Sequence, residues 1–203
     1  MLEPRIPETR LQRQSPFEGQ LTQGPLLFAT VTIKARPDLE IAEIGLFSRS
    51  ITAHGQFGHQ LARCLSITMP PEANRAVQSG DDLRMMALAP GRWWVVGDDG
   101  SSVRELLTKA DPKILPIDQS IIIDQSHGRA VLRLEGKGVR GLLNCGTAID
   151  LRDAAFTPNM IAQTRLSHYS VLVDCLEHDC FDLYIPRSFA RSALHWLCAR
   201  AAS

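Results

Sequence analysis

Runs of apolar and β-branched residues predict strands in the first half of the chain. Residues 26–33 read LLFATVTI and residues 39–47 read LEIAEIGLF, and both runs are typical of strands. Apolar residues then recur at helical spacing over residues 57–65, and Pro70 must end that helix. Residues 81–98 carry LRMMAL and WWVVG on either side of a turn, which predicts a hairpin.

The second half shows the same mixture of periodicities. Ser102 and Glu105 form an S-x-x-E capping box, which predicts the start of a helix. We expect further strands at residues 121–124, 130–135, 162–167, 170–175 and 181–185, and helices at residues 139–144 and 188–202. The last helix is expected to turn its apolar residues inward, namely Phe189, Ala193, Trp196, Leu197 and Ala201.

Strands, helices and hairpins are mixed along the chain without strict strand-helix alternation. This order predicts an α+β fold in two lobes, with mostly antiparallel sheets and flanking helices. We expect the lobes to span residues 26–112 and 113–203. Residues 1–25 hold four of the twelve prolines and few apolar residues, so they are expected to form an extended N-terminal arm.

Composition and charge narrow the function classes. The chain has 203 residues, of which 44% are hydrophobic, and its 22 basic residues balance 22 acidic ones. A neutral chain is a poor match for nucleic acid or for an anionic membrane surface. No apolar run approaches the roughly 20 residues that cross a bilayer, and the N-terminus lacks a secretion signal. Five scattered cysteines are then expected to be free thiols in a cytoplasmic protein.

One glycine motif resembles a dinucleotide site. Residues 136–141 read GKGVRG directly after a predicted strand and at a helix start. A dinucleotide site also needs a parallel βαβ unit and an acidic residue about 20 residues further on. Asp150 and Asp153 lie near that distance, but residues 149–156 do not read as a buried strand. We therefore interpret the motif as a tight turn from strand to helix.

A second candidate combines Asp124, Ser126 and His127, which are the residue types of a hydrolytic triad. Neighbours in a strand or turn point in different directions, and the chain has no G-x-S-x-G sequence. Asp, Ser, His and Gly are also common turn residues, so a turn is the favoured interpretation.

A third candidate is the cluster of Cys175, His178 and Cys180. Structural zinc requires four ligands, and no second pair lies nearby in the sequence. Packing at a hairpin is therefore favoured over metal binding. From the sequence we assign no catalytic, no cofactor-binding and no metal-binding residue.

Trp93 and Trp94 are adjacent in a predicted strand, so their side chains point to opposite faces. Alternation then allows at most one of them to lie in the core. The other is expected either to anchor an interface or to pack under the arm or the helix that starts at Ser102.

Three blocks carry a resemblance to a known family. They are ALAPGRWWVVGDDG from Ala87, IDQSHGRAVLRLEGKGVRGLLNCGTAIDL from Ile123 and FDLYIPRSFARSALHWL from Phe181. From about Leu83 onward the chain resembles the gamma subunits of heterotetrameric sarcosine oxidases. The segment DQSHGRAVLRLEGKGVRGLL is also similar to the start of the folate-binding fold of the glycine-cleavage T-protein.

The resemblance implies a non-catalytic structural subunit without a cofactor of its own. Its partners would be the alpha, beta and delta subunits, which would carry NAD, FAD, FMN, zinc and tetrahydrofolate. That complex would oxidise sarcosine to glycine and form hydrogen peroxide and methylenetetrahydrofolate. Two alternatives stay open: the equivalent subunit of an N-methyl amino acid dehydrogenase, such as the N-methylglutamate enzyme, and a stand-alone folate-binding one-carbon protein.

Overall fold

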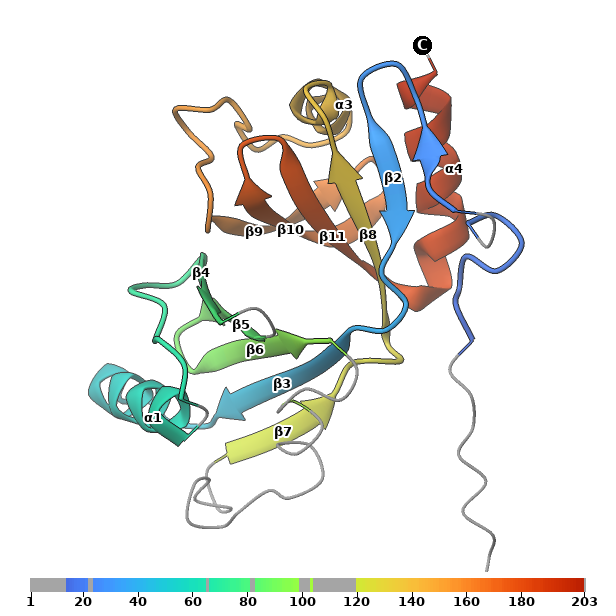
Figure 1. Ribbon diagram of the computed structural model, residues 1–203. Helices are drawn as coiled ribbons and strands as arrows, with labels where there is room; N and C mark the ends of the chain where they lie inside the picture. The colour runs from blue at the N-terminus through green and yellow to red at the C-terminus, as the bar shows by residue number, and fades with distance from the viewer. Residues whose placement is uncertain are drawn as a thin grey trace, which may run out of the picture.

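The computed structural model describes residues 14–21, 24–64, 66–80, 83–98, 103 and 120–202. Its strands form two antiparallel sheets that lie face to face, as Figure 1 shows. The six-stranded sheet has the order β1 (Leu26–Leu27), β2 (Thr32–Ala35), β8 (Arg129–Glu135), β11 (Cys180–Pro186), β10 (Tyr169–Glu177), β9 (Ile161–Leu166). The five-stranded sheet has the order β4 (Arg75–Ser79), β5 (Leu83–Ala89), β6 (Arg92–Gly97), β3 (Glu40–Leu46), β7 (Ser120–Asp124).

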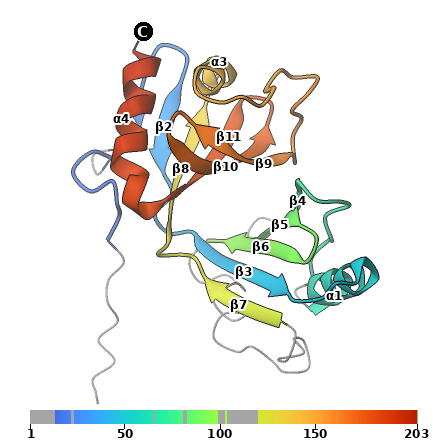
Figure 2. The ribbon, with the colours of Figure 1, turned by 180° about the vertical axis from the view of Figure 1, so that it is seen from behind.

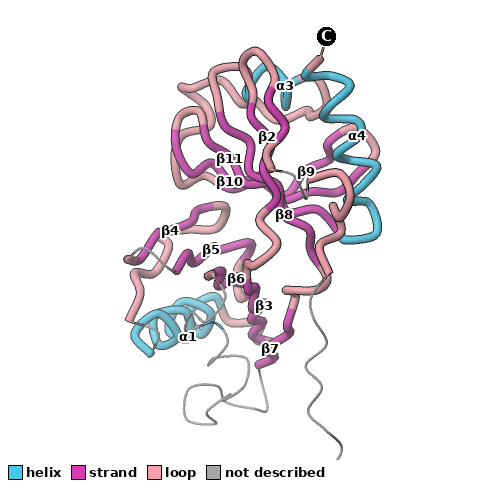
Figure 3. Tube along the Cα trace, turned by 45° about the vertical axis from the view of Figure 1, so that its right-hand side comes forward, coloured by secondary structure: helices cyan, strands magenta, loops and turns pink. Residues whose placement is uncertain are grey.

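Helices cover the outer faces of both sheets. Helix α1 (Ile51–Cys64) packs on the five-stranded sheet, and α3 (Val139–Asn144) and α4 (Ala190–Ala201) pack on the six-stranded sheet. The same layers are visible from behind in Figure 2, and Figure 3 separates the helices from the strands by colour. The result confirms the predicted α+β class with antiparallel sheets. None of the helices in the described ranges is long and apolar enough to cross a membrane.

Two neighbouring stretches of chain pass from one sheet to the other. β2 leads into β3, and β7 leads into β8, while β2 pairs with β8 and β3 pairs with β7. One bent two-stranded ribbon therefore contributes to both sheets. At the bend, the Ile41 amide donates to Ser126 Oγ (2.9 Å) and the Gln125 amide donates to the Ile41 carbonyl (2.9 Å).

The ribbon explains why the sheets do not follow the predicted lobes, 26–112 and 113–203. β1 and β2 come from the first of these stretches but lie in the six-stranded sheet, and β7 comes from the second but lies in the five-stranded sheet. Pairing between segments about a hundred residues apart cannot be read from local periodicity. The boundary at residues 112–113 and the helix predicted at Ser102 lie in the stretch that the structure leaves undescribed, apart from Val103.

Part of the predicted arm is packed against the domain. Within residues 14–21, the Phe17 side chain is buried in the core between the six-stranded sheet and its helices. Arg187 and Arg191 donate to the backbone carbonyls of Gln14 and Pro16. The low apolar content of residues 1–25 did not predict this contact. A single aromatic side chain, Phe17, is enough to fix the short turn against the core.

Two other sequence predictions need correction. The run at residues 26–33 is two short strands, β1 and β2, rather than one. Phe189, which was expected to face inward, is 49% exposed because it lies in a 3-10 turn (Arg187–Phe189) before α4, outside the helix's buried stripe. Leu194 is buried there instead, with Ala193 and Leu197.

Both adjacent tryptophans are buried, which contradicts the expectation that only one lies in the core. Trp93 faces α1, where its ring centroid is 5.7 Å from that of Phe57. Trp94 faces the six-stranded sheet and meets Tyr184 edge-on, with the centroids 5.6 Å apart. Alternation does place the two rings on opposite faces of β6, but this strand is covered on both faces.

An ion pair connects the inner faces of the two sheets. Arg84 on β5 donates from Nε and Nη2 to both carboxylate oxygens of Asp174 on β10, each at 2.7 Å. Burial raises the pKa of Asp174 to about 6, so the carboxylate is ionised at neutral pH. Burial lowers the pKa of Arg84, but the bonds to Asp174 outweigh this and raise it overall.

Asp174 lies directly opposite a second carboxylate, Asp182 on β11. Like charges opposite each other destabilise a sheet. Arg133 on β8 offsets this, because its Nε and Nη2 each bond Asp182 at 2.8 Å. Each of these two aspartates thus has its own guanidinium, and Arg84 reaches its partner across the layer between the sheets.

We expect Asp174→Asn to destabilise the fold by roughly 3–5 kcal/mol, because it leaves the Arg84 guanidinium buried without a counter-ion. The double variant Arg84→Met/Asp174→Leu should lose less than the single variant, since it removes both charges. Denaturant unfolding monitored by tryptophan fluorescence measures the difference. Asp150→Asn, which breaks an exposed pair with Arg152, is the control and should unfold like the unaltered chain. A double variant as unstable as Asp174→Asn would contradict this account.

Candidate functional site

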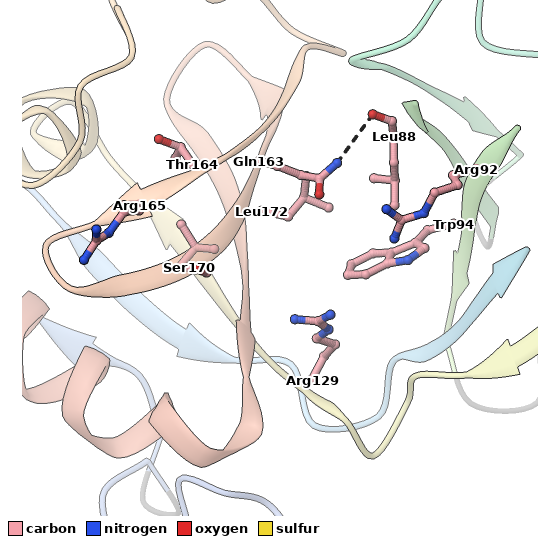
Figure 4. Close-up of a pocket in the computed structure, with 10 residues that line it drawn as sticks. Leu88, Arg92, Trp94, Arg129, Gln163, Thr164, Arg165, Ser170 and Leu172 are labelled. Carbon is pink, nitrogen blue, oxygen red and sulfur yellow. Dashed lines mark hydrogen bonds between the residues drawn. The ribbon is translucent and has the colours of Figure 1, made fainter. Parts of the chain in front are cut away.

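A cavity of about 430 Å³ opens at one end of the layer between the sheets. We call it the inter-sheet cavity, and Figure 4 shows its lining. Leu88, Arg92 and Trp94 line it from the five-stranded sheet, and residues 163–165 and 170–172 line it from the six-stranded sheet. Arg129, at the start of β8, lies near the bend of the ribbon. A volume of this size lies within the range of ligand pockets.

Positive charge dominates the lining of this cavity. Arg92 pairs with Glu43 at 2.6 Å, and Gln125 donates to the same carboxylate at 2.9 Å. Burial raises the pKa of Glu43, but these contacts lower it below its usual value, so the carboxylate is charged. Arg129 lies 5.1 Å above the Trp94 ring, and its buried Nε has no hydrogen-bond partner among the described residues.

A second cavity, of about 520 Å³, lies at the other end of the same layer and differs in its electrostatics. Three arginines also line it, but each is paired. Arg36 bonds Asp98 at 2.7 Å, and Arg84 and Arg133 bond Asp174 and Asp182 as described above. The inter-sheet cavity therefore stands out because its cations exceed its carboxylates.

Sequence reasoning missed the arginines of the inter-sheet cavity. Arg92 and Trp94 are two residues apart in one strand, so they share a face, and this signal was available from the sequence. Arg129 and Arg165 come from other strands, and only the sheet pairing brings them to the same cavity. Trp94 was correctly placed on the face opposite Trp93.

The glycine motif is filled by the chain's own backbone. Gly136 has a φ of +120°, and a Cβ there would lie 2.3 Å from the Thr30 carbonyl oxygen. A Cβ on Gly138 would lie 2.1 Å from Thr30 Oγ1, and the Gly138 amide donates to the Thr30 carbonyl at 3.1 Å. Thr30 thus occupies the position that a pyrophosphate would need. The residues present do not fit a dinucleotide.

The two aspartates considered with that motif form surface ion pairs instead. Asp150 bonds the Arg152 guanidinium at 2.6 Å, and Asp153 bonds Arg140 at 2.7 Å. Arg140 also donates to the Leu151 and Phe156 carbonyls, so it holds the loop after α3 in place. These contacts agree with the interpretation of a strand-to-helix turn.

The candidate triad residues serve the bend of the ribbon. Asp124 Oδ1 accepts from the Ser126 amide at 2.8 Å, and Ser126 Oγ accepts from the Ile41 amide at 2.9 Å. The His127 side chain is exposed and bonds neither residue. The structure does not bring the three together as a nucleophile, base and orienting acid.

The side chains of Cys175, His178 and Cys180 do not come together as a metal site. Cys175 is buried, and its Sγ donates to the Glu177 carbonyl at 3.3 Å. The His178 ring is exposed and contacts Asp179 at 3.0 Å and Asp153 at 2.9 Å, and these bonds raise its pKa. Among the described residues, no group of three His, Cys, Asp or Glu side chains is arranged to hold a metal ion.

The arrangement of sheets and helices matches known proteins. It is similar to a chain of heterotetrameric sarcosine oxidase from Corynebacterium sp. U-96, with a TM-score of 0.77 and 18% identity, covering 93% of this chain and 94% of that one. It is also similar to glycine cleavage system aminomethyltransferase T from Bartonella henselae, with a TM-score of 0.62 and 13% identity. That match covers 85% of this chain but 47% of the aminomethyltransferase. The fold is therefore the one shared by these two classes of protein.

A comparison with models of protein families identifies one family within this class. The chain belongs to the sarcosine oxidase gamma subunit family, whose model matches residues 49–203. The match begins before Leu83, where the sequence resemblance was expected to start, and so includes α1 and β4. Comparison with curated proteins gave no match.

The glycine motif yields a test of its structural role. Gly136→Ala should destabilise the chain by about 1–3 kcal/mol, because its φ of +120° is strained for alanine and the new Cβ meets Thr30. Gly141→Ala is the matched control, because it lies in α3 with nothing within 4 Å of an added Cβ. That change should be neutral or stabilising by up to about 1 kcal/mol. Equal effects of the two substitutions on thermal unfolding would contradict the assigned role.

The cysteines differ enough to be distinguished by alkylation. Burial raises the pKa values of the Cys175 and Cys180 thiols to about 11, which leaves little thiolate at pH 8. Cys145 is exposed. We expect iodoacetamide at pH 8 to label Cys145 well before the other two in the folded protein, as measured by peptide mass spectrometry. Denaturation should make the three rates similar, and early labelling of Cys175 would contradict its burial.

Proposed function

We propose that this chain is the gamma subunit of a heterotetrameric sarcosine oxidase and contributes no catalytic group of its own. The family match over residues 49–203 is the observation that carries the proposal. The end-to-end likeness to a chain of the Corynebacterium oxidase supports it, because that chain and this one cover each other almost completely. By contrast, the chain spans about half the length of the aminomethyltransferase that it matches.

The contacts made by the residues that look chemical in the sequence support a structural role for this chain. Thr30 fills the glycine motif, Ser126 holds the bend of the ribbon, and His178 lies on the surface between two aspartates. Thr30 and Ser126 thus hold the backbone at two of the three sequence candidates for chemistry, and His178 forms surface ion pairs at the third. In this proposal the alpha, beta and delta subunits hold FAD, FMN, NAD, zinc and tetrahydrofolate, and sarcosine is oxidised on them.

The proposal is tested by isolating the tagged chain from its own cells and characterising what elutes with it. We expect a yellow complex much heavier than this chain, whose flavin remains with another subunit after denaturation. The isolated complex should oxidise sarcosine and form hydrogen peroxide. Mass spectrometry of the components then identifies the subunits.

Other outcomes would overturn the proposal in different directions. A complex that oxidises another N-methyl amino acid and not sarcosine would point to a related dehydrogenase. A colourless protein that elutes alone or as a dimer, and that binds tetrahydrofolate tightly, would point to a stand-alone folate-binding protein.

A further inference from the structure

The inter-sheet cavity carries an excess of positive charge that the described residues do not neutralise. Arg92 pairs with Glu43, but Arg129 and Arg165 form no ion pair with any described residue. The whole chain is neutral, so this excess is local rather than a general basic character. Burial lowers the pKa of Arg129, and the nearby Glu43 carboxylate offsets this only in part.

An apolar strip lies beside this cavity. Phe47 is 72% exposed, and Ile121 and Ile123 are each 40% exposed. We call these three residues the β7 strip. Edge strands rarely present large apolar side chains to water, because such edges associate with other chains. β7 is the last strand of the five-stranded sheet among those that the structure describes.

Strand register puts Ile121 and Ile123 of the strip on the face of the sheet that lines the cavity. Ile123 lies opposite Glu43, which lies opposite Trp94 on the next strand. Ile121 is likewise opposite Gly45, which is opposite Arg92. Paired residues point to the same face, and neighbouring strands are about 4.8 Å apart. The β7 strip therefore begins about two strand spacings from the arginine and tryptophan of the cavity.

We propose that the inter-sheet cavity and the β7 strip together bind an acidic, partly apolar segment of a partner subunit. This inference rests on the proposed function, which requires partner subunits. A carboxylate of that segment would pair with Arg129, whose planar guanidinium can donate two parallel hydrogen bonds to it. Apolar side chains of the same segment would cover the β7 strip.

A polypeptide fits this surface better than a small anion does. A small molecule could neutralise Arg129 but would leave Phe47, Ile121 and Ile123 exposed to water. A segment of chain can fill the cavity and continue along the strand edge. Buried arginine and aromatic residues with an apolar surround are also the usual composition of binding hot spots.

Two substitutions test the charge. Arg129→Met keeps the long apolar side chain over Trp94 but removes the charge, and Arg165→Glu reverses the charge of an exposed residue. Each should weaken binding of the tagged chain to its partner subunits at least about tenfold, measured as the dissociation constant of the purified complex. The matched control is Arg152→Glu, which reverses an exposed arginine outside the cavity and should leave assembly unchanged.

The folded state of each variant is checked by its thermal unfolding before assembly is measured. Arg165→Glu keeps the inference testable if Arg129→Met fails to fold, because the Arg165 side chain is exposed and forms no ion pair with any described residue. Normal assembly of a folded Arg165→Glu or Arg129→Met variant would overturn the inference. Loss of assembly in Arg152→Glu as well would also overturn it, because the effect would then be general.

A photo-crosslinking residue at position 123 identifies the occupant. In the assembled complex it should capture a partner peptide that contains Asp or Glu. Capture of residues 99–119 of this chain, or of a second copy, would overturn the proposal. The same residue at position 27 is the control, because Leu27 is 75% exposed on β1, an edge strand of the other sheet.

These experiments separate the two levels of the argument. If the unaltered chain isolates with no partner, the proposed function fails. If it isolates with the oxidase subunits and the variants assemble normally, only the docking surface is wrong.

Discussion

The Arg84–Asp174 ion pair sets the spacing of the two sheets. It is fully bidentate, it is buried, and it joins the inner face of one sheet to that of the other. A buried pair of this kind need not add net stability over apolar side chains, but separating its partners leaves a buried charge uncompensated and is strongly destabilising. On the side of the layer away from this ion pair, the bent ribbon joins the two sheets covalently. The hydrogen bond from the Ile41 amide to Ser126 Oγ stabilises its bend. Between these two attachments, Trp94 and Tyr184 fill the layer.

The fixed distance between the two sheets leaves a cavity at each end of the layer, and the two cavities differ in charge balance. At one end the arginines find carboxylates within the chain, so the charges of that cavity are balanced. At the other end Arg129 stacks on Trp94 and has no carboxylate partner among the described residues. Sheets held apart by an ion pair and a ribbon cannot collapse to remove this imbalance. The excess of positive charge in the inter-sheet cavity is therefore a property of the fold, and a carboxylate from a partner subunit can neutralise it.

The sequence allowed prediction of most strands and of the antiparallel class, because alternation and turn residues are local signals. The hairpin of β10 and β11 and the helix α3 are where the pattern placed them. Sheet membership was not predictable, because β7 joins β3 from about eighty residues away. The same limitation explains Trp93 and Trp94, since alternation gives the faces of a strand but not which of them another layer covers. It also explains why Arg129 and Arg165 were not recognised as neighbours of one cavity.

The motifs that look chemical in the sequence are explained by close contacts within the fold. Gly136 and Gly138 lack side chains because the β1–β2 turn, at Thr30, lies against them. Ser126 accepts a backbone hydrogen bond at the bend, where the β2–β3 and β7–β8 segments both pass from one sheet to the other. Side chains without an internal partner are a different case. In the described part of this chain, cations and apolar groups of this kind lie at one open edge of the layer, where a partner can contact both.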